Sequence, residues 1–515
     1  MRIKHHNNYN WSAKVNEIIN LQTATNTLIT ANNSSQPIKN NFGELITAQL
    51  VPVIQDYTPY GIINEQLFIS FTATGGQVAA SPNGNEVDIS ITNSIGSFGV
   101  LRSKRVLKYR PGYSLVARMN ARFDSNAVAN SLQFAGVGNS DCDLYFCMNG
   151  TDFGVRRSTG GGLEVRELTI NSSATGSETA TITLNGTAFT VDLTNAGGDI
   201  DFSSYEISQG AYTGWTVEHI NGSVIFIGGS VGSRPGSYSF SSATATATFA
   251  QTHIGTALTT EFVAQADWNG SSDMTTNANP FLRNMYQVEY SWYGSGSISF
   301  QMLNPDTGRY EEVHMMKFAN ISNELSLSEP NMYIQRGVAS LGSTTALTMH
   351  TAGSFGAIYG QFSRLEPRQS IAVSKSLSSN TEKVMCALKN RLSINGFPNQ
   401  SEILLSSISV AADGNRVVVI RIIKNPDSLG AGTTSDYADF QYIDKPNSIS
   451  IVDTTAITYT GGTTLFTYVV GKNLSNTLEL EDKEIYLSKE DVLLITAESS
   501  ATNTVDLSVS FLEDL

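Results

Sequence analysis

The segment Ser114-Leu-Val-Ala-Arg-Met-Asn-Ala-Arg-Phe123 carries the clearest structural signal in the chain. Apolar residues occupy every second position from Leu115 to Phe123, while Arg118, Asn120 and Arg122 stand between them. A period of two places the apolar set on one face of an extended strand and the polar set on the other. The segment therefore predicts a half-buried strand of an antiparallel sheet.

The same alternation extends outward from this strand and indicates how the chain is organised. It covers about residues 67–164 and resumes over 284–365, while the intervening stretch carries a strong hairpin signal at Asn185-Gly186. We predict an all-β chain in which a jelly-roll (concanavalin-like) sandwich is interrupted by an inserted domain. The predicted domains are the N-terminal docking arm 1–60, the central β-sandwich 61–168 and 267–378, the inserted small β-rich domain 169–266 and the C-terminal β-sandwich 381–515.

The C-terminal sandwich is predicted from short apolar strands separated by regular turns. Its last strand has the cleanest pattern, with Val505, Leu507, Val509 and Phe511 alternating with polar residues. We expect these four side chains to point inward, because a slip of one residue would expose all of them.

The N-terminal arm differs in texture from the rest of the chain. Residues 12–21 have apolar side chains near helical spacing after a plausible N-cap, Ser12. A polar linker, 31–41, precedes the apolar segment 43–54, which has no domain of its own. We expect the arm to dock on another protein, and the alternative is that it packs on the body of the chain.

Composition and charge exclude several classes of protein. The net charge is −14 and the pI is about 4.9, which argues against nucleic-acid binding because that requires an excess of Lys and Arg. The sequence contains no run of 18 apolar residues, so we predict no membrane insertion. No signal peptide is expected. Cys142, Cys147 and Cys386 are expected to be buried free thiols. An extracellular-type composition without a secretion signal favours a protein that is assembled in a host cytoplasm and works in a virion.

Three stretches support this assignment by resemblance: Phe98-Gly-Val-Leu-Arg-Ser-Lys-Arg-Val-Leu-Lys-Tyr-Arg-Pro-Gly112, the region from Asn284 to His314, and Leu487-Ser-Lys-Glu-Asp-Val-Leu-Leu-Ile-Thr-Ala497. They resemble poorly characterised virion structural or tail-fibre-like proteins of tailed bacteriophages and some large DNA viruses. The resemblance covers most of the chain beyond residue 42. It implies a structural component, with other virion proteins as partners, and supplies no catalytic residues. Because fibre-like proteins are often trimers, a homo-oligomer is expected.

Motifs for catalysis and cofactor binding are weak in this sequence. A glycoside hydrolase needs a pair of carboxylates, and the best candidate, Glu479-Leu-Glu-Asp-Lys-Glu484, is better interpreted as a solvated turn. The segment Asn139-Ser-Asp-Cys-Asp143 alternates oxygen donors as calcium loops do, but it lacks the glycine and distal glutamate of such loops. We predict no catalytic residue, metal or cofactor. The alternative is a carbohydrate-active enzyme, a glycan depolymerase on the concanavalin-like fold.

Basic residues and tryptophans give the candidate binding residues. On one extended strand Arg102, Lys104, Lys108 and Arg110 would share a face, with Arg118 and Arg122 adding to it from a neighbouring strand. Such a face would dock an acidic neighbouring subunit or an anionic host-surface glycan; the alternative is a solvated outer face. Trp215 and Trp268 would stack on sugars if exposed, and the alternative for both is burial against a sheet edge.

Overall fold

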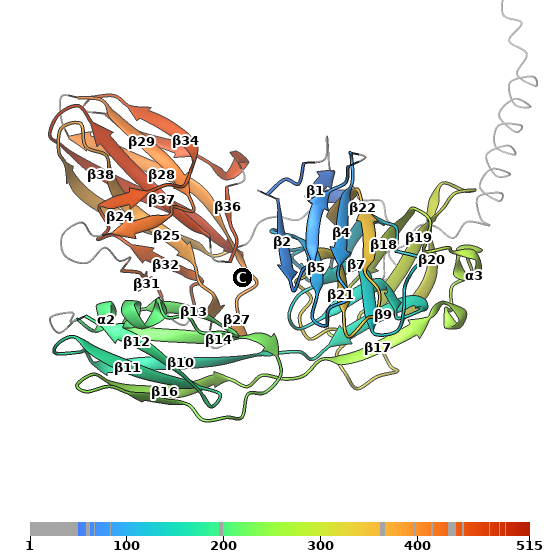
Figure 1. Ribbon diagram of the computed structural model, residues 1–515. Coiled ribbons are helices and arrows are strands. Elements are labelled where there is room, and N and C mark those ends of the chain that lie inside the picture. The colour runs from blue at the N-terminus through green and yellow to red at the C-terminus, as the bar shows by residue number, and fades with distance from the viewer. Residues whose placement is uncertain are drawn as a thin grey trace, which may run out of the picture.

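A computed structural model describes residues 50–514 except 58–61, 66, 83, 195–198, 361–365, 395–396, 414–415, 431–438, 445–446, 473, 484 and 490. Within these residues the chain is mostly β and forms three bodies (Figure 1). The predicted all-β class is confirmed, as is a jelly-roll sandwich with an insertion, followed by a second sandwich. No described helix is long and apolar enough to span a membrane.

The central sandwich packs a six-stranded sheet against a seven-stranded sheet. The six-stranded sheet has the order β1 (Leu50–Tyr57), β23 (Gly353–Tyr359), β6 (Leu115–Ala121), β18 (Asn284–Tyr290), β19 (Ile298–Asn304) and β20 (Arg309–Met316). The seven-stranded sheet has the order β17 (Thr259–Ala264), β9 (Asp152–Thr159), β8 (Asp143–Asn149), β7 (Ser131–Gly138), β21 (Tyr333–Ser340), β5 (Phe98–Ser103) and β2 (Phe68–Ala73). A small sheet of β22 (Leu347–Thr351), β4 (Val87–Ile91) and β3 (Gln77–Ala80) flanks them.

The core of this sandwich follows from the alternation seen in the sequence. On β6, Leu115, Ala117 and Met119 are fully buried, as the pattern predicted. Aromatic rings join the two sheets, because Phe146 on β8 lies 4.6 Å from the ring of Tyr286 on β18, measured between centroids. These contacts make both sheets parts of one hydrophobic core.

The predicted arm is wrong for its last part, because residues 50–57 belong to the body. They form β1, which pairs antiparallel with β23 and extends the six-stranded sheet. Ile54 is buried in the central core. For these residues the alternative, packing on the body of the chain, is correct. An apolar strand gains both backbone hydrogen bonds and burial at a sheet edge. The arm up to residue 49, with its predicted helical segment, lies outside the described residues.

The inserted domain is confirmed, but its boundaries move by one strand at each end. β10 (Leu163–Ser172) belongs to it, in a sheet with β13 (Trp215–Ile220), β14 (Ser223–Val231) and β16 (Thr246–His253). A second sheet contains β12 (Thr187–Leu193), β11 (Glu178–Leu184) and β15 (Ser239–Ser241), and helix α2 (Ile200–Ser208) completes the domain. β17, by contrast, pairs with β9 of the central sandwich. Positive φ angles at Asn185 and Gly186 confirm the predicted hairpin turn.

The C-terminal sandwich begins earlier than predicted, at β24 (Arg368–Leu377), because this strand pairs with the last strand. One sheet contains β24, β38 (Asn503–Asp514), β28 (Glu402–Asp413) and β35 (Ser475–Glu479), with β36 (Tyr486–Leu487) also on β28. The other has the order β31 (Gln441–Tyr442), β32 (Ser450–Asp453), β25 (Lys383–Asn390), β37 (Val492–Ser499), β29 (Val418–Lys424) and β34 (Thr463–Val470). Two short ladders, β26 (Ser393–Ile394) with β27 (Phe397–Pro398) and β30 (Ser428–Gly430) with β33 (Thr458–Thr460), complete it.

The last strand has the orientation that its sequence predicts. Val505, Leu507, Val509 and Phe511 are all buried in the C-terminal core, while Asp506 is exposed on the opposite face. The three cysteines are buried and free, which confirms that expectation.

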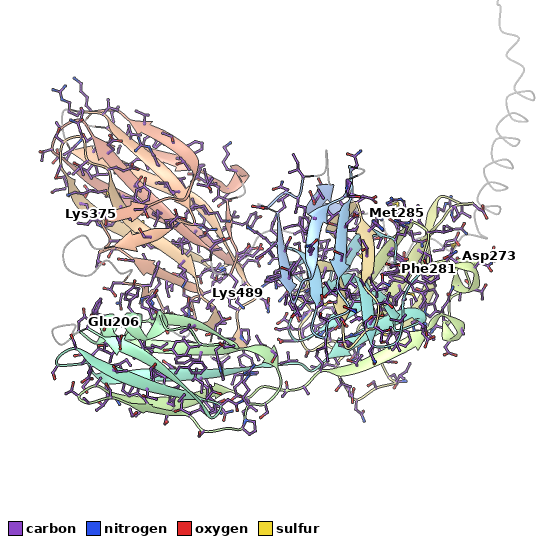
Figure 2. All side chains as sticks on the ribbon, viewed as in Figure 1. Glu206, Asp273, Phe281, Met285, Lys375 and Lys489 are labelled. Carbon is purple, nitrogen blue, oxygen red and sulfur yellow. The ribbon has the colours of Figure 1, made fainter. Side chains whose placement is uncertain are left out.

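The inserted domain also packs against the C-terminal sandwich. Helix α2, which carries Glu206, lies on the side that faces this sandwich (Figures 1 and 2). Ile225 and Ile227 of β14 share an apolar cluster with Leu392 and Leu494. Next to this cluster the buried carboxylate of Glu218 lies 2.6 Å from Lys389 Nζ and accepts a hydrogen bond from the Leu392 N–H.

Candidate functional site

The predicted basic face does not form as one continuous strand face. β5 ends at Ser103, and the chain then bends before Leu107 forms an isolated bridge with Met332. The Ser103 hydroxyl donates a hydrogen bond to the Arg105 carbonyl at this bend. The turn breaks the alternation on which the prediction rested, so the basic side chains of residues 102–110 diverge.

Two of these side chains meet the C-terminal sandwich. Lys108 Nζ donates to the Asp514 carbonyl at 2.9 Å and to the Ser401 hydroxyl at 3.3 Å. Arg110 Nη2 donates to Glu366 Oε1 at 2.6 Å and to Asp514 Oδ2 at 3.0 Å. Burial lowers the pKa of Lys108, and the nearby Asp514 carboxylate opposes this effect. The acidic partner expected from another subunit is therefore supplied by the same chain.

Arg105, which is not one of the residues predicted for the basic face, joins the same cluster. Its guanidinium lies 3.9 Å from the ring centroid of Tyr486, and its Nε is 3.8 Å from Glu402 Oε2. Glu402 also accepts a hydrogen bond from the Val106 N–H at 3.3 Å. Burial raises the pKa of Glu402, since desolvation outweighs the attraction of Arg105.

We call this arrangement the ionic joint, comprising Arg105, Lys108, Arg110, Glu366, Glu402 and Asp514. It surrounds a cavity of about 50 Å³ between the central and C-terminal sandwiches. That volume holds a few water molecules at most. The joint can bind two domains together, but it is too small for a glycan or a peptide.

The remaining basic residues of the prediction lie elsewhere and do not form a group with the joint. The Arg102 guanidinium lies between two rings, 4.5 Å from Phe71 and 4.4 Å from Tyr333. Arg118 donates from Nε to Gln287 Oε1 at 2.6 Å on the outer face of the six-stranded sheet. The backbone of Arg122 forms an isolated β-bridge with His350, which belongs to the small sheet. Lys104 is half-buried beside the bend.

The two tryptophans have different environments. Trp268 is buried in the central core, contacts Phe153 edge to face and donates from Nε1 to the Val263 carbonyl. The burial alternative is therefore confirmed, and the sugar-stacking interpretation of Trp268 does not hold. Trp215 is half-buried in the inserted domain, where the Arg234 guanidinium lies 4.7 Å from its ring centroid. Its binding role stays a prediction.

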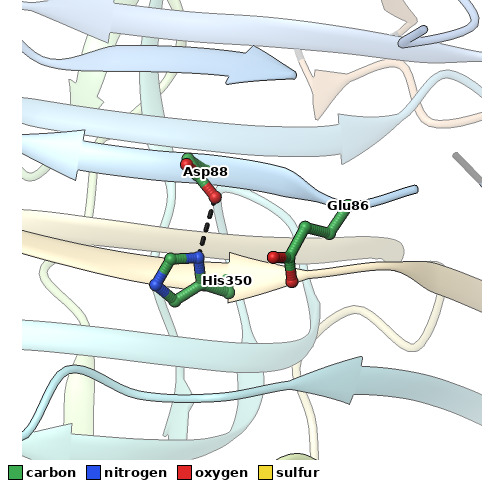
Figure 3. A group of neighbouring side chains, drawn as sticks. All are labelled: Glu86, Asp88 and His350. Atoms are coloured by element: carbon green, nitrogen blue, oxygen red, sulfur yellow. Dashed lines mark hydrogen bonds and ion pairs between the residues drawn. The ribbon is translucent and has the colours of Figure 1, made fainter. Parts of the chain in front are cut away.

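One potential metal-ligand group escaped the sequence analysis. Glu86, Asp88 and His350 place one ligand atom each within 4.8 Å of one another (Figure 3). His350 Nδ1 lies 2.7 Å from Asp88 Oδ1, and Arg283 Nη1 lies 2.6 Å from Glu86 Oε2. The hydrogen bond from Arg283 holds the pKa of Glu86 below its ordinary value. Because Arg283 already neutralises Glu86, the geometry does not call for a cation here.

The two weak motifs of the sequence are engaged within the chain. The Asn139 side chain accepts hydrogen bonds from the N–H groups of Asp141 and Cys142, and Asp143 pairs with Arg156 at 3.0 Å. The oxygens of Asn139 and Asp143, which resembled calcium ligands in the sequence, are therefore used in a turn and in an ion pair. Glu481 accepts a hydrogen bond from Arg368 Nη2 at 2.9 Å; the side chains of its acidic neighbours Asp482 and Glu484 lie outside the described residues.

Comparisons with known proteins give a likeness of fold only. No protein-family model and no curated protein matches the chain. Among solved structures, the metal-free carbohydrate recognition domain of Emp46p aligns with 58% of this chain and 90% of its own at 9% identity and a TM-score of 0.21. Arcelin-5, a lectin-like defence protein from Phaseolus vulgaris, aligns with 60% of this chain and 100% of its own (8% identity, TM-score 0.24). Rv0315, a pseudo β-1,3-glucanase of Mycobacterium tuberculosis, aligns with 60% and 99% (10% identity, TM-score 0.24).

Proposed function

We propose that this chain is a non-catalytic structural component of a virus particle. It is anchored by the residues that precede β1 and displays its β-domains for contact with other subunits or with host-surface glycans. The composition and the resemblance to virion structural proteins support this proposal.

The observation that carries the proposal is the ionic joint. Arg110 connects the central sandwich to Glu366 and Asp514 at the base of the C-terminal sandwich. Glu218 and the apolar cluster around Ile225 connect that sandwich to the inserted domain, which is itself linked to the central sandwich by two chain connections. Each domain therefore contacts the other two, directly or through the chain. Contacts among all three domains fix their relative positions, which suits a protein that displays binding surfaces on the outside of a particle.

The engagement of acidic side chains supports a non-catalytic role over the depolymerase alternative. A glycoside hydrolase needs two carboxyl groups about 5–10 Å apart that face a substrate. Glu86, Asp143 and Glu481 each form an ion pair with an arginine of the same chain. An ion pair with arginine favours the charged form of a carboxylate, so such a carboxylate is poorly suited to protonate a leaving group.

Two measurements on purified particles test this function. Quantitative mass spectrometry should find the chain at a fixed copy number per particle, and antibody labelling should place it on the particle surface. A chain that is absent from purified particles would contradict the structural role. In parallel, incubation with polysaccharides of the host surface should release no reducing sugar, whereas catalytic release would favour the depolymerase.

A further inference from the structure

The edge of the C-terminal sandwich carries an open strand. β34 is the last strand of its six-stranded sheet and pairs with β29 on one side. Among the described residues no strand pairs with its other side. Backbone N–H and C=O groups along such an edge are a ready template for another strand.

This edge lacks two of the features that keep natural edges apart, charged side chains and proline. The eight residues of β34 include no charge and no proline. On its solvent face Leu465 and Val469 are 39% and 57% exposed, and Val417 and Leu474 nearby are 47% and 58% exposed. A group of exposed aliphatic side chains beside an open edge is typical of an interface.

The sequence of β34 is complementary to itself about Thr467. If two copies pair antiparallel across a twofold axis at Thr467, Leu465 lies opposite Val469 and Phe466 opposite Tyr468. Residues at equal distances on the two sides of Thr467 point to the same face of a strand. The pair Leu465–Val469 would therefore join two aliphatic side chains on the solvent face, and the pair Phe466–Tyr468 two aromatic side chains on the core face. A bulge in the pairing with β29 leaves Leu465 without a partner on that strand. The opposite side of β34, where the second copy would pair, has no strand among the described residues.

Charges beyond the ends of the strand fit the same register. Lys472 of one copy would approach residues 461 and 462 of the other. At that point the Asp427 carboxylate lies against Gly461, since a Cβ on Gly461 would be 1.9 Å from Asp427 Oδ2. Lys472 and Asp427 are both exposed. The twofold axis forms this complementary pair twice and brings no like charges together within the strand, which matters for a chain of net charge −14.

We propose that two copies of this chain associate by antiparallel pairing of their β34 strands, which joins their C-terminal sheets into one. A single pair of strands buries less than the about 1,600 Å² of a standard interface. We therefore expect a dimer that dissociates on dilution. This inference is independent of the virion role.

The register can be tested with a cysteine at the axis. In full-length Thr467→Cys the two introduced thiols would face each other on Cα atoms about 4.5–5.5 Å apart, a distance that a disulfide can span. The native cysteines are buried and should not compete. Mild oxidation should give a covalent dimer on non-reducing gels.

The matched variant Thr463→Cys, on the same strand and also exposed, should stay monomeric. In the proposed register, the same cysteine of the second copy lies eight positions away along the strand. Equal cross-linking of both variants, or of neither, would overturn the proposal.

Sedimentation velocity of the full chain tests the surface without oxidation. Val469→Lys and Lys472→Glu should each reduce the dimer fraction at least tenfold at a fixed concentration, and Asp427→Lys added to Lys472→Glu should restore it. Leu341→Lys, at an equally exposed leucine of the central sandwich, should have no effect. A chain that is monomeric at every concentration, or a trimer that persists in Val469→Lys, would show that the contact is wrong.

Discussion

Arg110 and Asp514, 404 residues apart in the sequence, form an ion pair with 3.0 Å between Nη2 and Oδ2. The pair joins the segment after β5 to the last strand of the chain. The same guanidinium holds Glu366 at 2.6 Å, directly before β24. One side chain therefore binds both the entry and the end of the C-terminal sandwich to the central one, and its removal should loosen the two domains together.

Arg110→Gln should destabilise this interface. The variant leaves the buried carboxylate of Glu366 without its cation, which typically costs about 1–3 kcal/mol. Differential scanning calorimetry should show a lower melting temperature, and small-angle scattering should show a larger radius of gyration if the domains separate. As a control, Arg368→Gln removes an ion pair with Glu481 in which both side chains are about half exposed, and should cost under about 1 kcal/mol. Equal effects of the two changes would mean that the ionic joint does not hold the domains.

The ionic joint should also respond to pH through Glu402. Burial raises the pKa of Glu402 in the folded protein, whereas the unfolded chain releases the proton near pH about 4.3. The folded state therefore binds this proton more tightly, so the free energy of unfolding falls as pH rises from about 4.3 through the raised pKa. Glu402→Gln keeps an oxygen for the Val106 N–H and removes the titration.

We expect the melting temperature of Glu402→Gln to decline less than that of the wild type between pH about 4.5 and 7. Thermal melts across this range check the expectation, with Glu481→Gln as a control on a half-exposed carboxylate of the same domain. If the wild type instead gained stability relative to Glu402→Gln on going to neutral pH, attraction to Arg105 would outweigh burial and our sign would be wrong.

Local patterns predicted the strands, but not which sheet each strand joins. The alternation of Val505, Leu507, Val509 and Phe511 is a property of neighbouring residues, so the buried face could be identified directly. The domain boundaries depend on pairing over long distances. The predicted boundary after residue 168 cut through β10, and β17 and β24 were assigned to the wrong body, because the partner strands that decide the assignment lie far away in the sequence.

The same limit applies to the candidate site. The concentration of basic residues near Lys108 was visible in the sequence, but its partners Glu366 and Asp514 are hundreds of residues away. The group of Glu86, Asp88 and His350 has only the Glu-x-Asp alternation as a local signal, since β22 brings His350 to β4 across 262 residues. Partner choice in both sites is decided by the sheet topology.

Truncation of the N-terminus distinguishes the anchor from the body. Deletion of residues 1–49 should leave a folded protein, because β1 and its pairing with β23 remain. Deletion of residues 1–57 removes β1, the buried Ile54 and the carboxylate of Asp56. Asp56 opposes the effect of burial on Arg336, whose pKa is lowered to about 10 within the core. The longer deletion should therefore lower the melting temperature by several degrees and promote aggregation through the exposed edge of β23.

The incorporation of the truncated proteins into particles then tests whether residues 1–49 are the anchor. The 1–49 deletion should melt like the full chain and yet fail to enter particles. If it is incorporated normally, the anchor lies elsewhere in the chain. If both deletions melt like the full chain, β1 contributes little to the central sandwich and the sheet assignment of residues 50–57 needs revision.

The last strand should tolerate change on one face only. Phe511 is completely buried in the C-terminal core, where β38 lies between β24 and β28. Phe511→Ala removes a large side chain that its neighbours cannot fully replace, which typically costs about 3–5 kcal/mol. A domain of this size has only about 5–15 kcal/mol of stability, so its melting temperature should fall by many degrees. Ser510, one residue earlier, points to the outer face between Ser370 and Ser407. Ser510→Ala should therefore change the melting temperature by little in the same calorimetric scan. Equal losses from the two substitutions would mean that β38 is not buried on one face, and the two-sheet packing of the C-terminal domain would have to be abandoned.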